Sequence, residues 1–243
     1  MFKLGLLLVY LALFSIVSLP MYLYVRIIKK KDELKAADYA RKIICGAFKF
    51  LFINLGVKVK CIGVENVPKD EPVLFVGNHR GYADIAAAYM TLPVATGFVA
   101  KKEMRKAPCI SNWLTHARGV YLDRKNPKEG LKAILEAIDN VNKGISMFIM
   151  PEGTRSHGDE MIPFKKGSLK IAEKTKCSIV PVAFTNTDHV FERQYPRITK
   201  ANIIIEYGKP IYVRDLTSEQ MKTLTEDVQA VIKEMLDKNS NKA

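Results

Sequence analysis

The 243-residue chain has few of the residues that stabilise small secreted folds or build metal sites: four cysteines, four histidines and one tryptophan. The four cysteines lie far apart in the sequence, form no C-x-x-C pair and do not stand at metal-ligand spacing from a histidine: Cys45, Cys61, Cys109 and Cys177. This pattern gives no sign of a redox or zinc site. It indicates reduced, mostly buried thiols in a cytoplasmic domain.

Acidic residues are also scarce, because 25 Asp and Glu stand against 38 Lys and Arg and leave a formal net charge of +13. Such a balance favours a polyanionic partner, which could be nucleic acid, an anionic membrane surface or a phosphorylated or acidic substrate. A solvated basic surface without a specific partner is the alternative. The basic residues are scattered and no nucleic-acid-reading motif is present, so we expect no nucleic-acid partner.

The longest apolar run lies at the N-terminus, where residues 4–25 contain no charged side chain. A helix of this length can cross a hydrocarbon core about 30 Å thick. Lys3 precedes the run, and Arg26 and Lys29–Lys31 follow it, whereas a cleaved signal peptide carries its positive charge mainly before the apolar run. The positive flank predicts a cell-membrane protein whose main domain lies on the cytoplasmic side.

Residues 36–55 repeat apolar side chains at helical spacing and carry Arg41, Lys42 and Lys49 at polar positions. Such a helix could lie at a membrane interface or pack on a soluble core. Pro20 permits a kink in the preceding run, so two neighbouring helices could enter one leaflet without crossing it. We expect residues 1–56 to form N-terminal membrane-anchoring helices, and spanning or one-leaflet insertion both remain open.

From residue 57 to the C-terminus, short β-rich runs alternate with helical stretches, and no internal repeat or low-complexity linker interrupts them. Strands are expected at 57–62, 72–77, 95–100, 119–122, 145–150, 179–183 and 201–207, and helices after Asp84 and at 127–143, 167–175 and 217–238. This order predicts an α/β domain over residues 57–243, with a mixed, largely parallel sheet flanked by helices. Ligands usually gather beyond the carboxyl ends of such strands, and four clusters follow or lie beside the expected strands at 78–84, 118–124, 151–156 and 180–184.

The first cluster, N-H-R-G-Y-A-D, places His79 and Asp84 on either side of a glycine. A turn at Gly81 can bring the carboxylate back to the imidazole and fix its tautomer, which leaves the other ring nitrogen free to take a proton. This pair suits a histidine that deprotonates a hydroxyl without a serine or cysteine nucleophile between them. A histidine that caps a helix or makes a core hydrogen bond is the alternative.

The third cluster, P-E-G-T-R-S, follows an apolar strand directly. Gly153 permits an unusual backbone turn, and Arg155 offers a planar fork for a phosphate. Glu152 could bind a substrate hydroxyl or orient Arg155. The alternative is an ordinary polar loop with a surface ion pair.

The second cluster supplies a further phosphate candidate, Arg124, which Asp123 could brace. Lys101 and Lys102 follow another expected strand. They are either further candidates for binding a phosphate or solvent-exposed side chains. The fourth cluster, I-V-P-V-A-F, is apolar and suits the wall or floor of a site.

The four clusters, in this order over residues 57–210, resemble the glycerolipid acyltransferase family, which includes the 1-acylglycerol-3-phosphate (lysophosphatidic acid) acyltransferases. The family blocks N-H-x4-D, G-x-x-x-D-R, P-E-G-T-R-S and V-P-V-A match residues 78–84, 119–124, 151–156 and 180–183. Met150, Val120 and Tyr121 depart from the usual residues but keep the apolar character of the strands. Four blocks in order are far more specific than any one of them.

The resemblance implies that His79 removes the proton of a lysophospholipid hydroxyl and that Asp84 orients the imidazole. The alkoxide would attack the thioester of acyl-CoA or acyl-ACP, with backbone amides or Lys101 stabilising the oxyanion. It also implies a substrate-binding set of Lys101, Arg124, Glu152, Gly153, Thr154 and Arg155. Neither a metal nor a cofactor is expected, since His116, His157 and His189 are not placed to form a convincing site.

Several other functions fit part of the sequence. The same chemistry could act on glycerol-3-phosphate, dihydroxyacetone phosphate, another lysophospholipid or an aminoacyl lipid, because the blocks are shared; the small size favours 1-acylglycerol-3-phosphate as acceptor and phosphatidic acid as product. A hydrolase would use His79 and Asp84 to activate water. A non-catalytic protein would bind the anionic phospholipid bilayer through its helices and basic face alone.

Overall fold

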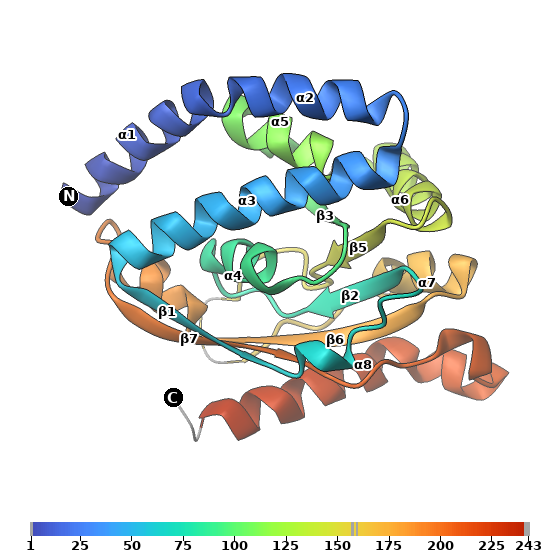
Figure 1. Ribbon diagram of the computed structural model, residues 1–243. Coiled ribbons are helices and arrows are strands. Elements are labelled where there is room, and N and C mark those ends of the chain that lie inside the picture. Colours follow the sequence, from blue (N-terminus) through green and yellow to red (C-terminus); the bar gives the residue numbers. More distant parts are fainter. Residues whose placement is uncertain (1, 157, 159, 241–243) are drawn as a thin grey trace.

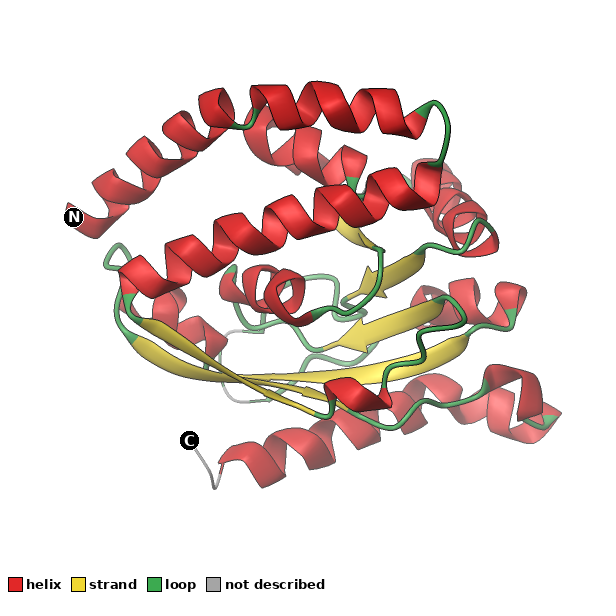
Figure 2. Cartoon of the chain, in the orientation of Figure 1, coloured by secondary structure: helices red, strands yellow, loops and turns green. Residues whose placement is uncertain are grey.

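The chain folds around one seven-stranded sheet, seen in a computed structural model that describes residues 2–156, 158 and 160–240. The strand order is β1-β7-β6-β2-β5-β3-β4, and every neighbouring pair is parallel except β6 and β7. The expected α/β fold with a mixed, largely parallel sheet is confirmed, and each expected strand is present (Figure 2): β1 (Val57–Ile62), β2 (Val73–Gly77), β3 (Thr96–Lys101), β4 (Val120–Leu122), β5 (Ser146–Ile149), β6 (Ser178–Thr185) and β7 (Ala201–Tyr207).

Helices cover both faces of the sheet (Figure 1). One buried apolar cluster joins one face to α2–α5, and a second joins the other face to α6–α8. The α-helices are α1 (Phe2–Val17), α2 (Leu19–Lys29), α3 (Glu33–Leu55), α4 (Ala83–Thr91), α5 (Pro108–His116), α6 (Pro127–Asn142), α7 (Lys170–Thr175) and α8 (Ser218–Ser240). Short 3₁₀ helices are η1 (Val64–Asn66), η2 (Lys102–Lys106), η3 (Lys166–Leu169), η4 (Thr187–Val190), η5 (Glu192–Gln194) and η6 (Val213–Asp215). Helix α5 was not expected from the sequence.

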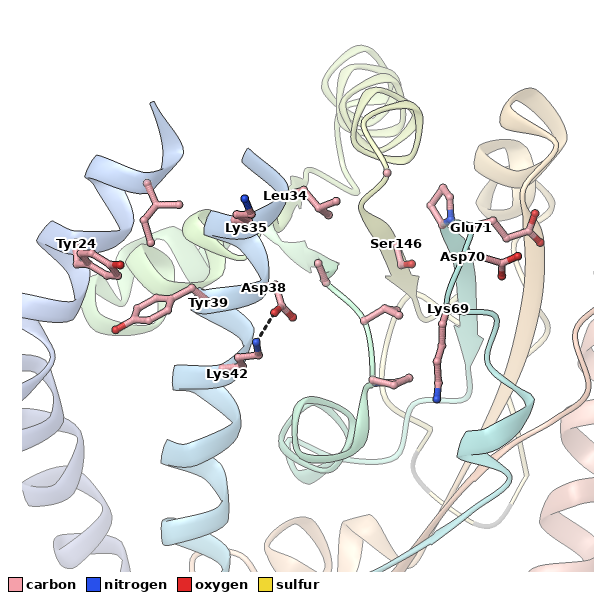
Figure 3. A pocket seen from close by; sticks show the side chains of 16 residues that line it. Tyr24, Leu34, Lys35, Asp38, Tyr39, Lys42, Lys69, Asp70, Glu71 and Ser146 are labelled. Atoms are coloured by element: carbon pink, nitrogen blue, oxygen red, sulfur yellow. Dashed lines mark ion pairs between the residues drawn. The ribbon is translucent and has the colours of Figure 1, made fainter. Parts of the chain in front are cut away.

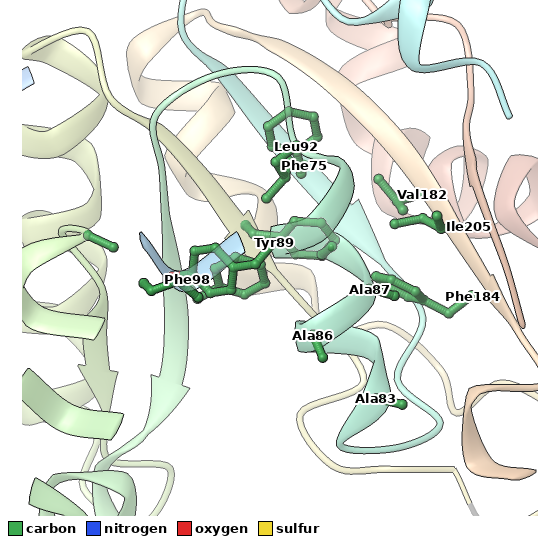
Figure 4. Packing of buried hydrophobic residues seen from close by; sticks show 14 of the residues in the cluster. Phe75, Ala83, Ala86, Ala87, Tyr89, Leu92, Phe98, Val182, Phe184 and Ile205 are labelled. Carbon is green, nitrogen blue, oxygen red and sulfur yellow. The ribbon is translucent and has the colours of Figure 1, made fainter. Parts of the chain in front are cut away.

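A row of phenylalanines crosses the centre of the sheet at one level. Register pairs Phe75 of β2 with Phe148 of β5, and Phe148 with Phe98 of β3. The ring centroids of Phe98 and Phe148 are 4.8 Å apart, and those of Phe75 and Phe148 are 5.7 Å apart. Tyr89 of α4 packs on Phe98 from the helical layer (Figure 4). Because this row aligns three parallel strands, the loops that follow them begin at the same edge.

The apolar N-terminal run forms two helices instead of one straight helix, with a 51° bend between α1 and α2 at Ser18 (Figure 1). Pro20 follows the break and has no N–H to donate to the preceding turn. The buried indole N–H of Trp113 in α5 donates to the Ser18 hydroxyl over 3.2 Å. No described helix is long and apolar enough by itself to cross a bilayer, although the bent pair meets the length and composition required.

Helix α3 begins and ends with capping residues and packs on the sheet side of the molecule. The Asp32 carboxylate accepts the amide of Lys35 over 2.9 Å at one end, and Gly56 takes a left-handed conformation at the other. Ala36, Ala40, Ile44, Phe52 and Leu55 are buried in the cluster that contains β2 and β7. This segment could have been a helix at a membrane interface or a helix packed on the core, and these buried residues fit packing on the core. The division of the chain at residue 56 stays a prediction.

We expect Phe148→Ala to destabilise the protein because Phe148 is fully buried and its ring contacts the rings of three other phenylalanines. Removal of a large aromatic side chain from a packed core costs about 3–5 kcal/mol of unfolding free energy. Thermal unfolding in detergent measures the effect, with Leu135→Ala on the exposed surface of α6 as control. Equal melting temperatures for the two variants would contradict a central role for the phenylalanine row.

Candidate active site

His79 and Asp84 meet at the carboxyl end of β2, as the sequence predicts. His79 follows the strand, and Asp84 lies in the first turn of α4. The Nδ1 atom of His79 is 2.8 Å from Oδ2 of Asp84, which also accepts the amides of Arg80 and Gly81 over 2.8 and 2.9 Å. Asp84 is completely buried, so its carboxylate holds the imidazole in one orientation. With Nδ1 bound in this way, Nε2 is the ring nitrogen that can take a proton.

Asn78 ties the start of this turn to the neighbouring strand β6. Its side-chain amide donates to the carbonyl of Phe184 over 3.1 Å, and its side-chain oxygen accepts the Phe184 amide over 2.7 Å. Both bonds are buried, where unpaired polar groups would be costly. Asn78 thus extends the link between β2 and β6 to the residue that precedes His79.

Glu152 holds the backbone of His79. It lies just beyond β5, and its Oε1 accepts the His79 amide over 2.6 Å while its Oε2 accepts the Ile162 amide over 2.9 Å. Burial raises the pKa of Glu152 above its ordinary value, although the two amide bonds favour the ionised form. The sequence suggested that Glu152 could orient Arg155. Its oxygens instead bind backbone amides, and Arg155 pairs with Glu192.

The other residues of the P-E-G-T-R loop have distinct surroundings. Gly153 has a φ of +73°, a left-handed conformation that favours glycine, and the flexible end of the Lys165 side chain lies beside it. Thr154 is exposed. The guanidinium of Arg155 lies 4.2 Å from the centre of the Tyr82 ring and donates through Nη1 to Glu192 over 2.9 Å.

Lys101 and Arg124 lie toward the edge of the sheet, on β3 and on the loop after β4. Lys101 is exposed and lies 3.7 Å from Glu103. Arg124 is exposed as well. The sequence allowed Asp123 to brace Arg124, but in the structure Asp123 pairs with Lys102 over 2.5 Å. The structure thus joins His79, Asp84 and Glu152 directly and leaves Lys101 and Arg124 two and three strands away from β2.

Sequence reasoning missed Glu192 and Lys165. Glu192 lies in η5, on the loop after β6, and contacts the turn after β2 because β6 and β2 are neighbours in the sheet. Neither residue belongs to a recognisable block, so only the sheet order could have placed Glu192 at the site.

An open cavity of about 720 Å³ lies away from His79, beside the residues that precede β2, β3 and β5 (Figure 3). Its lining mixes lysines with carboxylates, and Lys42 is paired with Asp38 over 2.8 Å. The hydrogen-bonded histidine and carboxylates lie at the other ends of these strands, so chemistry and not cavity size locates the candidate site. Within the described ranges, no group of three or more His, Cys, Asp and Glu side chains is arranged to hold a metal ion.

The sequence of this chain is similar to those of known acyltransferases. The model of the family described as Acyltransferase matches residues 58–185. The 1-acyl-sn-glycerol-3-phosphate acyltransferases of Saccharomyces cerevisiae and Borreliella burgdorferi are each 32% identical, over 72% and 65% of this chain. The chain spans about three fifths of their length, 59% and 60%.

A solved structure is similar over nearly the whole chain. It is the crystal structure of the 1-acyl-sn-glycerophosphate (LPA) acyltransferase, PlsC, from Thermotoga maritima. Its TM-score is 0.79 at 29% sequence identity, and the match covers 99% of this chain and 98% of that one. The similarity therefore includes the N-terminal helices as well as the sheet.

The raised pKa of Glu152 predicts how its contribution to stability depends on pH. Glu152 binds a proton more readily in the folded chain than in the unfolded one, so its contribution is complete below the ordinary carboxyl pKa, about 4.3, and is lost as pH rises through the raised value. Glutamine does not titrate. We therefore expect the unfolding free energy of the wild type, minus that of Glu152→Gln, to decrease from pH 4 to pH 8.

Melting temperatures at several pH values measure this difference. Glu219→Gln is the control, because Glu219 is exposed and pairs with Lys222 on the surface of α8; it should change the melting temperature little. A difference that increases with pH would show that the pKa of Glu152 is lowered, not raised.

Proposed function

Because this chain belongs to the acyltransferase family, we propose that it transfers a fatty acyl group from an acyl thioester to the sn-2 hydroxyl of 1-acylglycerol-3-phosphate. The product is phosphatidic acid, the precursor of phospholipids. The enzymes to which the chain is similar carry this activity in their names. The observation that supports it most strongly is the 2.8 Å contact between His79 and the buried Asp84.

The geometry supports direct attack of the acceptor on the thioester. Nε2 of His79 takes the hydroxyl proton, and the resulting oxygen nucleophile forms a bond to the thioester carbonyl carbon. Asp84 stabilises the imidazolium that forms. The tetrahedral intermediate then breaks its C–S bond, and the imidazolium returns the proton to the departing thiolate. Backbone amides or Lys101 stabilise the oxyanion in this proposal.

Arg155 is the best-placed group for the acceptor phosphate. Its planar guanidinium suits bidentate phosphate recognition, and the Tyr82 ring and Glu192 hold it beside the turn that carries His79. Arg124 and Thr154 remain proposed substrate contacts because they lie in the family blocks. Lys101 remains one because it lies at the end of β3. Gly153 shapes the loop, and Glu152 positions His79 through its amide.

The acyl donor is acyl-CoA or acyl-ACP, which acts as co-substrate, and we propose no metal or other cofactor. Both donors are acidic, so the net charge of +13 favours their approach. The transfer forms an ester bond and breaks a thioester bond, so it needs neither an oxidant nor a reductant.

We further propose that α1 and α2 bind the phospholipid bilayer and that the catalytic residues lie on its cytoplasmic side. The two helices expose a broad apolar surface, formed by Leu6, Leu8, Val9, Leu13, Ile16, Val17, Leu19, Leu23 and Ile27. A surface of this kind is uncommon on soluble proteins and marks an interaction site. The basic residues Arg26, Lys29 and Lys30 follow at the end of α2, where they can contact anionic headgroups.

The first test is acyl transfer by the detergent-purified protein from labelled thioester to a panel of acceptors. The wild type should convert 1-acylglycerol-3-phosphate to phosphatidic acid in preference to glycerol-3-phosphate or other lysophospholipids. We expect His79→Ala to lower kcat by roughly 10²–10⁴-fold, the usual contribution of a general base.

His189→Ala is the matched control for the loss of a histidine, because the His189 ring makes no hydrogen bond within the part of the chain that the structure describes and its backbone bonds survive the substitution. It should leave the transfer rate close to that of the wild type. Release of free fatty acid alone would show that the enzyme is a hydrolase. Equal rates for His79→Ala and wild type would exclude His79 as the base.

The membrane proposal predicts that Ile16→Glu with Val17→Glu weakens binding to vesicles that contain anionic phospholipid. Both side chains are exposed at the end of α1, and a buried glutamate would be costly in the hydrocarbon region. Cosedimentation measures binding. Leu131→Glu with Leu135→Glu makes an equal change on the exposed surface of α6 and should leave binding unchanged. Equal loss in both double variants would contradict a specific role for α1.

A further inference from the structure

Glu192 joins the turn that carries His79 to the loop that carries Arg155. It lies in η5, and its side chain is only 12% exposed. A single oxygen, Oε1, accepts both the Tyr82 amide over 2.8 Å and Nη1 of Arg155 over 2.9 Å. The residues that it links are separated from it by 110 and 37 positions in the sequence.

The backbone of the turn is shaped to receive this carboxylate. A Cβ atom at Gly81 would lie 2.5 Å from Oε2 of Glu192, so the close approach depends on glycine at this position. Tyr82 directly precedes α4, where amides have no partner within the helix and favour an anion. Asp84 accepts the amides of Arg80 and Gly81, and Glu192 accepts the next amide. Two carboxylates therefore fix three successive amides between His79 and α4.

Arg155 is held on two sides by these neighbours. Glu192 binds Nη1, and the central carbon of the guanidinium lies over the ring of Tyr82, 4.2 Å from its centre. The N–H groups of a guanidinium form a rigid fork, so a bond to one nitrogen and a contact at the central carbon restrict the directions of the others.

The loop after β6 is itself anchored at the site by a second carboxylate. Asp188 of η4 is nearly buried, lies 3.6 Å from Nε of Arg80 and accepts Nε of Arg193 over 2.6 Å. The family match ends at residue 185, so both carboxylates lie outside the matched segment. The loop after β6 thus carries two carboxylates that contact residues of the family blocks.

We propose that Glu192 is a positioning residue that sets the direction of Arg155 for the acceptor phosphate and couples phosphate binding to the His79 turn. This inference rests on the proposed acyl transfer to a phosphate-bearing acceptor. It predicts that loss of Glu192 weakens the use of the acceptor through Arg155 and leaves use of the thioester donor unchanged.

The test compares Glu192→Ala, Glu192→Asp and Glu192→Gln in steady-state acyl transfer from labelled acyl thioester to 1-acylglycerol-3-phosphate. Glu192→Ala removes both hydrogen bonds, and Glu192→Asp retracts the carboxylate by one methylene. Both should raise the acceptor KM roughly ten- to a hundredfold, the worth of one charged hydrogen bond, with the donor KM unchanged. Glu192→Gln keeps an acceptor oxygen for both bonds and should stay within about threefold of wild type.

A double-mutant cycle with Arg155→Ala separates positioning from a general structural role. If Glu192 acts through Arg155, Glu192→Ala adds no further increase in acceptor KM in the Arg155→Ala background. Gln194→Ala, an exposed neighbour in η5, is the matched control and should behave as the wild type.

The outcomes are distinct. An unchanged acceptor KM in Glu192→Ala, or equal increases in acceptor and donor KM, would overturn the positioning role. So would additive effects in the double variant. A wild-type protein that transfers no acyl group to any phosphate-bearing acceptor would instead show that the proposed function is wrong, and the inference would fail with it.

Discussion

The position of β2 between β5 and β6, parallel to both, is the constraint on which the candidate site depends. Parallel strands end at the same edge, so the loops after β2, β5 and β6 meet there although they are far apart in the sequence. The row of Phe75, Phe148 and Phe98 fixes the level at which β2 and β5 lie against each other and against β3. The distance between His79 and Glu152 is thus set by core packing as well as by their own hydrogen bond.

Around His79, carboxylates bind mostly backbone amides. Asp84, Glu152 and Glu192 together accept the amides of residues 79, 80, 81, 82 and 162. Each of these hydrogen bonds fixes the backbone of a loop at the site. The carboxylates can be buried there because they accept these hydrogen bonds. Only Glu192 among the three also binds a cationic side chain of the P-E-G-T-R loop.

The sequence was sufficient to predict the strands, the fold class and the contact between His79 and Asp84, because these depend on local patterns. The strand edges and the turn at Gly81 are encoded within a few residues. Helix α5 was missed, and the bonds from Glu152 to the amides of His79 and Ile162 were not foreseen, because hydrogen-bond partners depend on which loops the sheet brings together. Glu192 shows the same limit: it contacts Tyr82 across 110 positions and belongs to no motif.

The hydrogen bond between Trp113 and Ser18 holds the bend between α1 and α2 in place. Both residues are buried, and the ring of Phe14 also packs near the indole. A straight rod from residue 3 to residue 29 would leave the indole N–H unpaired, at a cost of about 1–3 kcal/mol. Helix α5 therefore determines the angle between α1 and α2, so the helical layer that packs on the sheet also fixes the inclination of the apolar helix α1.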